Sequence, residues 1–144
     1  MGTNNPNLPN NVLSDEEAIQ YLAMMVAALK NQTFVQKSGA GPFTLTATEM
    51  VGGVVEFSGG AAVTTNTDTA VAIVARMQAL DANAGVGSTA SFAIDNGNSG
   101  TMTVAGGTGV TLVGSGATSI LTTIVRRYQI KVLTLTTVSL TVVG

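Results

Sequence analysis

The segment TMTVAGGTGVTLVGS, residues 101–115, shows the pattern that decides the fold. Threonine and valine dominate it, and both residues suit the pleated, half-buried surface of a β-strand. Glycines interrupt the pattern at 106–107 and 109, and again at 114, where we expect turns. The segment therefore predicts two short strands, over 101–104 and 108–113, joined as a hairpin.

The same texture extends over most of the chain. Apolar residues and threonines alternate over 43–48, which predicts a half-buried strand. Further strands are expected over 54–57, 91–94, 120–130 and 138–143, and Asn96-Gly97 favours a hairpin turn between 91–94 and 101–104. Turns at this spacing are typical of a sandwich or small barrel. The prediction is a mainly β domain over 38–144, a small antiparallel β-sandwich or barrel of about seven strands.

One helix is expected inside this domain. Thr67-Asp68-Thr69 offers an N-cap, and Ile73, Met77 and Leu80 follow at helical spacing. Asn83-Ala84-Gly85 is a stop signal. These signals predict an inserted helix over 69–81.

The N-terminal part of the chain differs in character. Residues 1–13 are rich in asparagine and proline, which predicts an extended arm. Ser14 and Glu17 form a capping box, and Ala18, Leu22, Met25 and Leu29 follow at helical spacing, so we expect an amphipathic helix over 14–31. Its apolar stripe needs a cover, which either a neighbouring subunit or the chain's own sheet supplies.

Composition excludes several kinds of chemistry. The 144 residues include no His, Cys or Trp, so no imidazole or thiolate zinc site and no Ser-His or Cys-His nucleophile can form. The net charge of −2 offers no general attraction to nucleic acid. The apolar run over 18–29 is too short to span a bilayer and follows acidic residues, unlike a secretory signal. We expect no enzyme, no cofactor, no metal site and no membrane contact.

The charged fraction is only 10%, far below that of an ordinary soluble domain. Threonine, serine, asparagine, glutamine and glycine must therefore cover the outside of the molecule. Such a surface is either covered by other protein chains or is a neutral, hydroxyl-rich β surface.

Three motifs favour structural roles over catalytic ones. Residues 85–90, GVGSTA, have dinucleotide-binding spacing but are expected to close a helix and open a strand, the reverse of a nucleotide site. Residues 95–100 resemble the start of a calcium loop but lack its final glutamate. Nothing in the sequence brings together two of the carboxylates Glu49, Glu56, Asp68 and Asp81 for glycoside hydrolysis.

The only basic cluster is Arg126-Arg127-Tyr128 with Lys131. On a strand, Arg126 and Arg127 point to opposite faces, so they do not form one phosphate-binding patch. The cluster either pairs with the acidic segment 41–95, within or between subunits, or docks on an acidic protein surface.

Residues 41–144 resemble small β-domains of tailed-bacteriophage virions, especially capsid decoration (cement) proteins. The stretches that carry the resemblance are FTLTATEMVGGVVEF (43–57), TDTAVAIVARMQAL (67–80), GVGSTASFAIDN (85–96) and TMTVAGGTGVTLVGS (101–115). The resemblance implies a non-enzymatic β-sandwich that forms a homotrimer and clamps neighbouring major capsid protein subunits at the virion surface, after assembly in the host cytoplasm.

The candidate interface residues are Leu22, Met25 and Leu29 of the helix and Arg126 and Arg127 of the basic cluster. On this interpretation the arm reaches along the shell, and the helix either docks on the shell or forms the trimer contact. Two other functions remain open: a tail-fibre or baseplate adaptor of the virion, and a cellular ligand-binding β module.

Overall fold

A computed structural model of the chain describes residues 15–30 and 32–143 and, within the first helix, the side chains of residues 15–20, 22 and 23. The chain divides into two compact units, Met1–Gln32 and Thr33–Gly144. The described part of the first unit is mainly the helix α1 (Asp15–Lys30), whose acidic first turn suits the positive end of the helix dipole. The helix expected over 14–31 is therefore confirmed, whereas the predicted arm and Ser14 lie outside the described residues.

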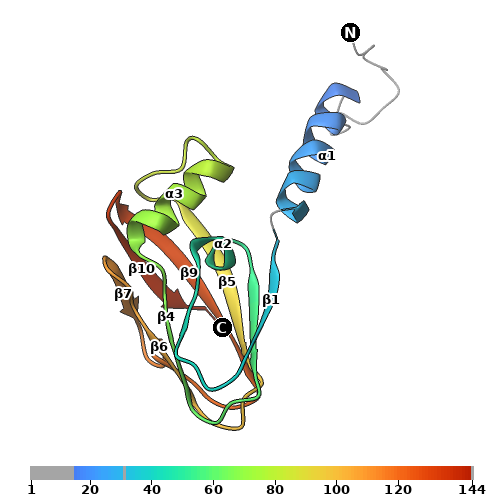
Figure 1. The fold of residues 1–144 in the computed structure, drawn as a ribbon. Helices are drawn as coiled ribbons and strands as arrows, with labels where there is room; N and C mark the ends of the chain where they lie inside the picture. Colours follow the sequence, from blue (N-terminus) through green and yellow to red (C-terminus); the bar gives the residue numbers. More distant parts are fainter. Residues whose placement is uncertain (1–14, 31, 144) are drawn as a thin grey trace. The chain divides into compact units, whose positions relative to one another are not determined.

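The described residues of the second unit, 33–143, form ten strands in two mixed sheets and two further helices (Figure 1). The large sheet has, in spatial order, β1 (Phe34–Ser38), β3 (Val54–Ser58), β5 (Thr89–Asn96), β9 (Ile124–Thr134), β10 (Thr137–Val142) and β7 (Val110–Val113). The small sheet has β2 (Phe43–Thr44), β4 (Val63–Asn66), β6 (Met102–Ala105) and β8 (Ser119–Ile120). The helices are α2 (Ala47–Met50) and α3 (Ala70–Leu80). The mainly β sandwich expected from the sequence is confirmed, and the described strands do not close into a barrel.

The chain alternates between the two sheets at every step from β1 to β9. As a result β1, β3 and β5 lie side by side and parallel in the large sheet, and β2, β4 and β6 do the same in the small sheet. Parallel neighbours need a long crossover, and here the crossover runs through the opposite sheet. The result is three stacked strand–turn–strand units, which we call the first arch (34–44), the second arch (54–66) and the third arch (93–105).

The expectation of antiparallel hairpins is therefore wrong in most places. Asn96-Gly97 does not join paired strands, because β5 belongs to the large sheet and β6 to the small one. The glycines at 106–109 likewise connect β6 to β7 across the two sheets. The strand expected over 120–130 is divided into β8 and β9, again in different sheets. Among the described strands, only β9 and β10 form a hairpin of sequential strands.

The β-domain also begins earlier than predicted, at Phe34 instead of residue 38. The strand expected over 43–48 is only two residues long and passes into α2. Thr46 and Glu49 form a capping box there: the Thr46 hydroxyl accepts from the amide of Glu49, whose carboxylate accepts from the Thr46 amide. This reciprocal pairing satisfies two backbone amides at the start of α2 and so favours a helix at this point of the chain. The helix expected over 69–81 is confirmed as α3 with Thr69 as its N-cap.

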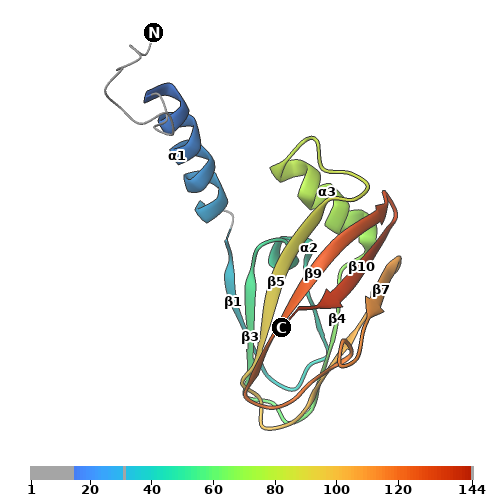
Figure 2. The same cartoon turned by 180° about the vertical axis from the view of Figure 1, so that it is seen from behind.

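The core lies between the two sheets and beneath the helices. Among the described residues the largest fully buried side chains include Tyr128, Phe57, Leu45, Met50, Ile73 and Leu140. The helix α2 contacts α3, β3 and β5, and α3 contacts β10, so the helices close one end of the sandwich (Figure 2). In the part of the chain that the structure describes, no helix has both the length and the apolar character needed to cross a membrane.

Candidate interaction surface

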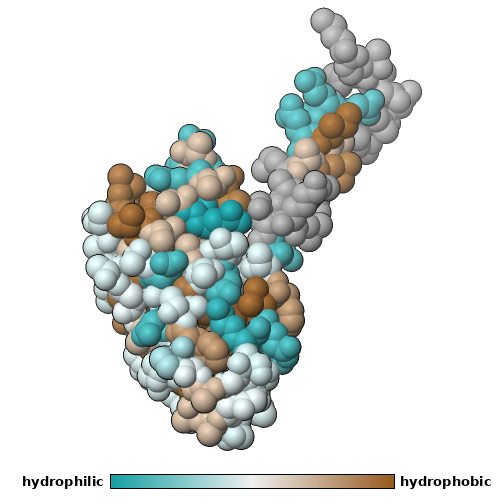
Figure 3. All heavy atoms as spheres, in the orientation of Figure 1, coloured by the Kyte–Doolittle hydropathy of each residue, from teal (hydrophilic) through white to brown (hydrophobic). Residues whose placement is uncertain are grey.

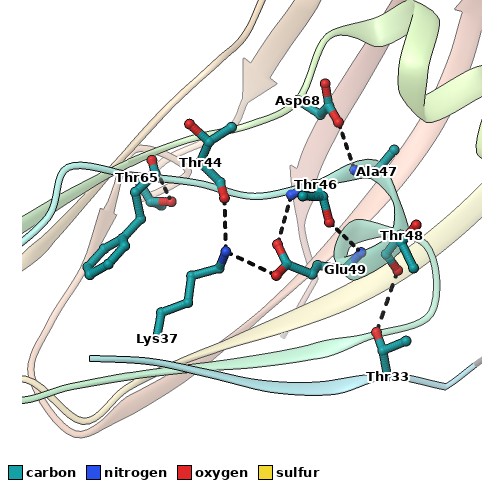
Figure 4. Close-up of polar contacts among 10 residues, drawn as sticks. Thr33, Lys37, Thr44, Thr46, Ala47, Thr48, Glu49, Thr65 and Asp68 are labelled. Carbon is teal, nitrogen blue, oxygen red and sulfur yellow. Dashed lines mark hydrogen bonds and ion pairs between the residues drawn. The ribbon is translucent and has the colours of Figure 1, made fainter. Parts of the chain in front are cut away.

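A polar cluster ties the first arch to α2 (Figure 4). The Lys37 ammonium lies 3.0 Å from a carboxylate oxygen of Glu49 and donates to the Thr44 carbonyl oxygen at 3.0 Å. The other oxygen of Glu49 accepts from the Thr46 amide at 2.8 Å. Glu49 is only 8% exposed. The negative charge of Glu49 is therefore compensated by the Lys37 ammonium and the Thr46 amide. These contacts give Glu49 a structural role.

Asp68 completes this cluster from the segment before α3 (Figure 4). Its carboxylate accepts from the amides of Ala47, at 2.9 Å, and Thr69, at 2.8 Å. Glu49 and Asp68, which the sequence left unconnected, thus reach adjacent backbone amides at the start of α2. Both carboxylates are occupied by capping bonds, so the pair does not have the arrangement of an acid and a base facing a substrate.

A second polar cluster lies at the turn of the third arch. Asn96 is fully buried, and its amide nitrogen donates to the carbonyl oxygens of Gly100, Ile120 and Leu121 at 3.0–3.2 Å. Its amide oxygen accepts from the backbone and side-chain nitrogens of Asn98. The asparagines of the segment that resembled a calcium loop, Asn96 and Asn98, are therefore already used inside the fold. Among the described residues no three His, Cys, Asp or Glu side chains come together to hold a metal ion.

The basic cluster lies on β9, and the prediction that its arginines face opposite ways is confirmed. Arg126 is half-buried on the inner side, and Arg127 is exposed on the outer side. Tyr128 is buried, stacks on Phe92 with 5.2 Å between ring centroids, and donates to the Ala117 carbonyl oxygen at 3.0 Å. Burial raises the pKa of Tyr128 to about 12, against the opposing effect of the nearby Arg126 charge.

The motif at 85–90 lies between a helix and a strand, as expected from the sequence. It follows the end of α3 and leads into β5, with the Gly85 amide donating to the Ser88 hydroxyl at 3.0 Å. A nucleotide site would need the opposite order, strand then helix. The loop instead pairs with β9, where the amides of Gly87 and Val132 donate to the carbonyl oxygens of Val132 and Ser88 respectively.

The outward faces of the two sheets differ in charge. On the large sheet, the side chains that alternate with the buried ones include Glu56, Asp95, Arg127 and Lys131. On the small sheet, the outward positions form two rows across the strands, Thr44–Asn66–Ala105 and Thr64–Thr103–Ser119. None of these six residues is charged. We call them the threonine face.

The threonine face belongs to a larger uncharged region. Apart from β2, the strands of the small sheet come from residues 57–67 and 96–125, and neither stretch contains a charged residue. In Figure 3 much of the lower β-domain is pale, the colour of intermediate hydropathy. The charge-poor surface expected from composition is thus concentrated around one sheet, which sequence reasoning did not foresee because it depends on which strands pair.

Of the predicted interface residues in α1, Leu22 is 59% exposed, and Ile19, which the prediction omitted, is 67% exposed. The side chains of Met25 and Leu29 lie outside those that are described. On the β-domain, exposed apolar residues at the end where β9 meets β10 include Leu133 and Leu135.

Comparisons with known proteins identify no relative. No protein family model, no curated protein and no solved structure matches the chain.

Proposed function

We propose that this chain is a non-enzymatic structural protein of a bacteriophage virion, a capsid decoration protein that binds the major capsid protein shell as a homotrimer. Its site of action is then the virion surface, reached after assembly in the host cytoplasm. The resemblance of residues 43–57, 67–80, 85–96 and 101–115 to virion β-domains motivates the proposal.

The observation that carries the proposal is the threonine face. Charged residues are depleted at the centre of protein interfaces and enriched on surfaces that stay in water. The two sheets of one small domain differ in this respect, since the large sheet has two acidic and two basic residues outward and the threonine face has none. We therefore assign the shell contact to the threonine face and the solvent-facing side to the large sheet.

The other two candidate functions rest on less. A tail-fibre or baseplate adaptor would use the same surface on a tail instead of a head. A cellular ligand-binding module would need a polar pocket or aromatic platform, and the only side-chain clusters described above are occupied by internal hydrogen bonds.

Immunogold labelling of virions from the source of this sequence tests the proposal. An antibody against the chain is expected to place gold over the head. Gold confined to the tail would contradict the decoration role and favour the adaptor. Absence of the protein from purified virions, checked on denatured particles, would overturn both virion roles.

A matched pair of variants tests the assignment of the face. Thr103, at the centre of the threonine face, and Ser91, on the outer side of β5, are both exposed. Thr103→Asp is expected to lower the number of copies bound per head at least tenfold, because a charge would be buried without a partner. Ser91→Asp should leave occupancy unchanged. Equal occupancy of the two variants would contradict the assignment.

A further inference from the structure

Asn96 is the asparagine of this chain most prone to deamidation, because of the residue that follows it. Deamidation begins when the backbone nitrogen of the next residue attacks the carbon of the side-chain carboxamide. Glycine obstructs this attack least, since it has no Cβ and leaves the backbone free to bend. Asn96-Gly97 is the one Asn-Gly pair in the sequence.

The reaction is a hydrolysis that proceeds through a cyclic imide. The Gly97 nitrogen forms a bond to Cγ of Asn96 and gives up its proton to hydroxide, while the carboxamide nitrogen takes up a proton from water and leaves as ammonia. Water then opens the imide at either of its carbonyl groups. The product is aspartate, or isoaspartate, in which the main chain runs through the side-chain carbon.

The folded chain opposes this reaction. The Asn96 side chain is fully buried, so solvent hydroxide and water do not reach it. Its amide nitrogen, which has to leave, donates to three carbonyl oxygens, and these acceptors cannot supply the proton that ammonia needs. The following peptide group is also held, since the Asn96 carbonyl oxygen accepts from the Thr123 amide at 2.8 Å. The two nitrogens of Asn98 bind the carboxamide oxygen but do not replace the missing water.

We propose that Asn96-Gly97 is a latent modification site, which the fold protects and which deamidates when the third arch opens. A group buried in this way reacts through open forms of the chain, and these forms are rare in a stable domain. The inference concerns the β-domain alone and does not depend on the proposed function.

Deamidation at this position also prevents the chain from folding again. An aspartate at 96 would place a negative charge against the three carbonyl oxygens that the amide now binds, and a buried charge without a compensating group is strongly unfavourable. Isoaspartate would lengthen the main chain at the end of β5, where Asn96 lies opposite Ile124 of β9. Unfolding therefore becomes irreversible to an extent that grows with the time spent unfolded.

Timed incubation of the full-length chain tests the protection. One sample is held in guanidinium at mildly alkaline pH, and a native sample is held at the same pH without denaturant. Peptide mass spectrometry then measures the conversion of each asparagine. Asn96 should deamidate at least about tenfold faster in the unfolded sample. Asn83, which is exposed in the folded chain and followed by alanine, is the internal control and should differ less between the samples.

Gly97→Ala is the matched variant for the consequence. It keeps Asn96 but adds a Cβ that hinders the attack, and this Cβ would lie 3.0 Å from the Phe57 carbonyl oxygen, so a small shift accommodates it. On dilution from guanidinium, the refolded fraction of wild type, measured by circular dichroism, should fall with holding time in step with deamidation at Asn96. The alanine variant should keep its refolded fraction over the same time.

Two results would overturn the inference. Equal rates at Asn96 in the native and unfolded samples would show that the fold gives no protection. A wild-type chain that is deamidated at Asn96 and still refolds in full would show that the modification does not block folding. Both measurements on wild type stand even where Gly97→Ala fails to fold.

Discussion

The three stacked arches fill one inward position in three different ways. Lys37 of the first arch, Phe57 of the second and Asn96 of the third lie beside one another in register across β1, β3 and β5. Phe57 contributes apolar surface to the core and is tilted against Phe43, with 5.4 Å between ring centroids. Asn96 binds backbone carbonyls, and Lys37 reaches the Thr44 carbonyl and the Glu49 carboxylate.

This comparison teaches that backbone stacking does not demand one kind of side chain. The second and third arches keep a constant separation of 39 residues in both strands, with Val54 beside Ala93 and Val63 beside Met102. Phe57 and Asn96 are both fully buried with a paired strand on either side, so enclosure alone does not select the kind of side chain. Near the turns, backbone groups leave the sheets, and polar side chains satisfy them.

The largest loss of stability is expected at the second arch, where the inward position is the apolar residue Phe57. Phe57→Ala should lower the free energy of unfolding by about 4 kcal/mol, because it removes a fully buried aromatic ring and leaves a cavity. Guanidinium unfolding followed by circular dichroism measures it. Phe34→Ala, at a residue 69% exposed on β1, is the control and should change stability by about 0.5 kcal/mol or less. Similar losses at both positions would contradict the arch description.

The next largest loss of stability is expected at the third arch, where the side-chain amide of Asn96 is buried. Asn96→Leu preserves approximate size but leaves three carbonyl oxygens without their donor, so we expect a loss of about 3 kcal/mol in the same unfolding experiment. Asn66→Leu changes an exposed asparagine on the threonine face and should cost no more than about 0.5 kcal/mol. An Asn96→Leu variant as stable as wild type would contradict this prediction. It would show that an apolar side chain serves the second and third arches equally.

A smaller effect is expected at the first arch, which lies at the edge of both sheets. Lys37→Met should cost about 1.5 kcal/mol, because it keeps most of the apolar stem but leaves the nearly buried Glu49 without its cation. Lys131→Met, at an exposed lysine, is the matched control. The double variant Lys37→Met/Glu49→Gln should lose less stability than the sum of the losses in the two single variants, because each single change already breaks the ion pair. This double-mutant cycle isolates the interaction between the two side chains. Strict additivity would contradict the ion pair.

The smallest loss of stability at neutral pH is expected at Tyr128 of β9, which pairs with Phe92 of β5. Tyr128→Phe should cost about 1 kcal/mol through loss of the hydrogen bond to the Ala117 carbonyl oxygen. The folded chain holds the phenol proton to a pKa of about 12, against 10.0 for an ordinary tyrosine. The folded state therefore binds more protons in this window, and wild-type stability should fall as pH rises from about 10 to 12.

Unfolding measured at pH 8 and pH 11.5 in both chains checks the tyrosine prediction. The phenylalanine variant should lose less stability than wild type over that interval, because it lacks this ionisation. Identical pH dependence in the two chains would show that Tyr128 ionises in the folded state as readily as in the unfolded chain.

Much of the local structure could be predicted from the sequence. The helices now seen over 15–30 and 70–80 follow from apolar spacing, and the N-cap of the second from Thr69. The short helix α2 was missed although its signal was present, because Thr46 and Glu49 have capping-box spacing inside a stretch that alternates like a strand. The hairpin between β9 and β10 has no glycine at its turn; Thr134 instead accepts from the Thr136 amide at 3.2 Å.

Of the candidate surfaces, one could be predicted from the sequence and the others could not. The apolar stripe of α1 was visible in the sequence, because residues on one helix face recur at fixed spacing. The threonine face was not, since its rows join strands from residues 44 to 119. The cluster of Lys37, Glu49 and Asp68 likewise joins three segments whose proximity depends on the stacking of the arches.

The sequence by itself determined that this is a mainly β protein with a separate N-terminal helix, and that Arg126 and Arg127 face opposite ways. Those features depend on residue type and on periods of two or 3.6 residues, which act within a single element. Only the tertiary structure decided that consecutive strands enter different sheets, because strand pairing is set by burial and register over distances of 20 to 40 residues. Asn96-Gly97 shows the difference: the same dipeptide suits a hairpin turn locally, but here Asn96 is needed inside the fold to bind the carbonyl oxygens of β8 and the turn after it.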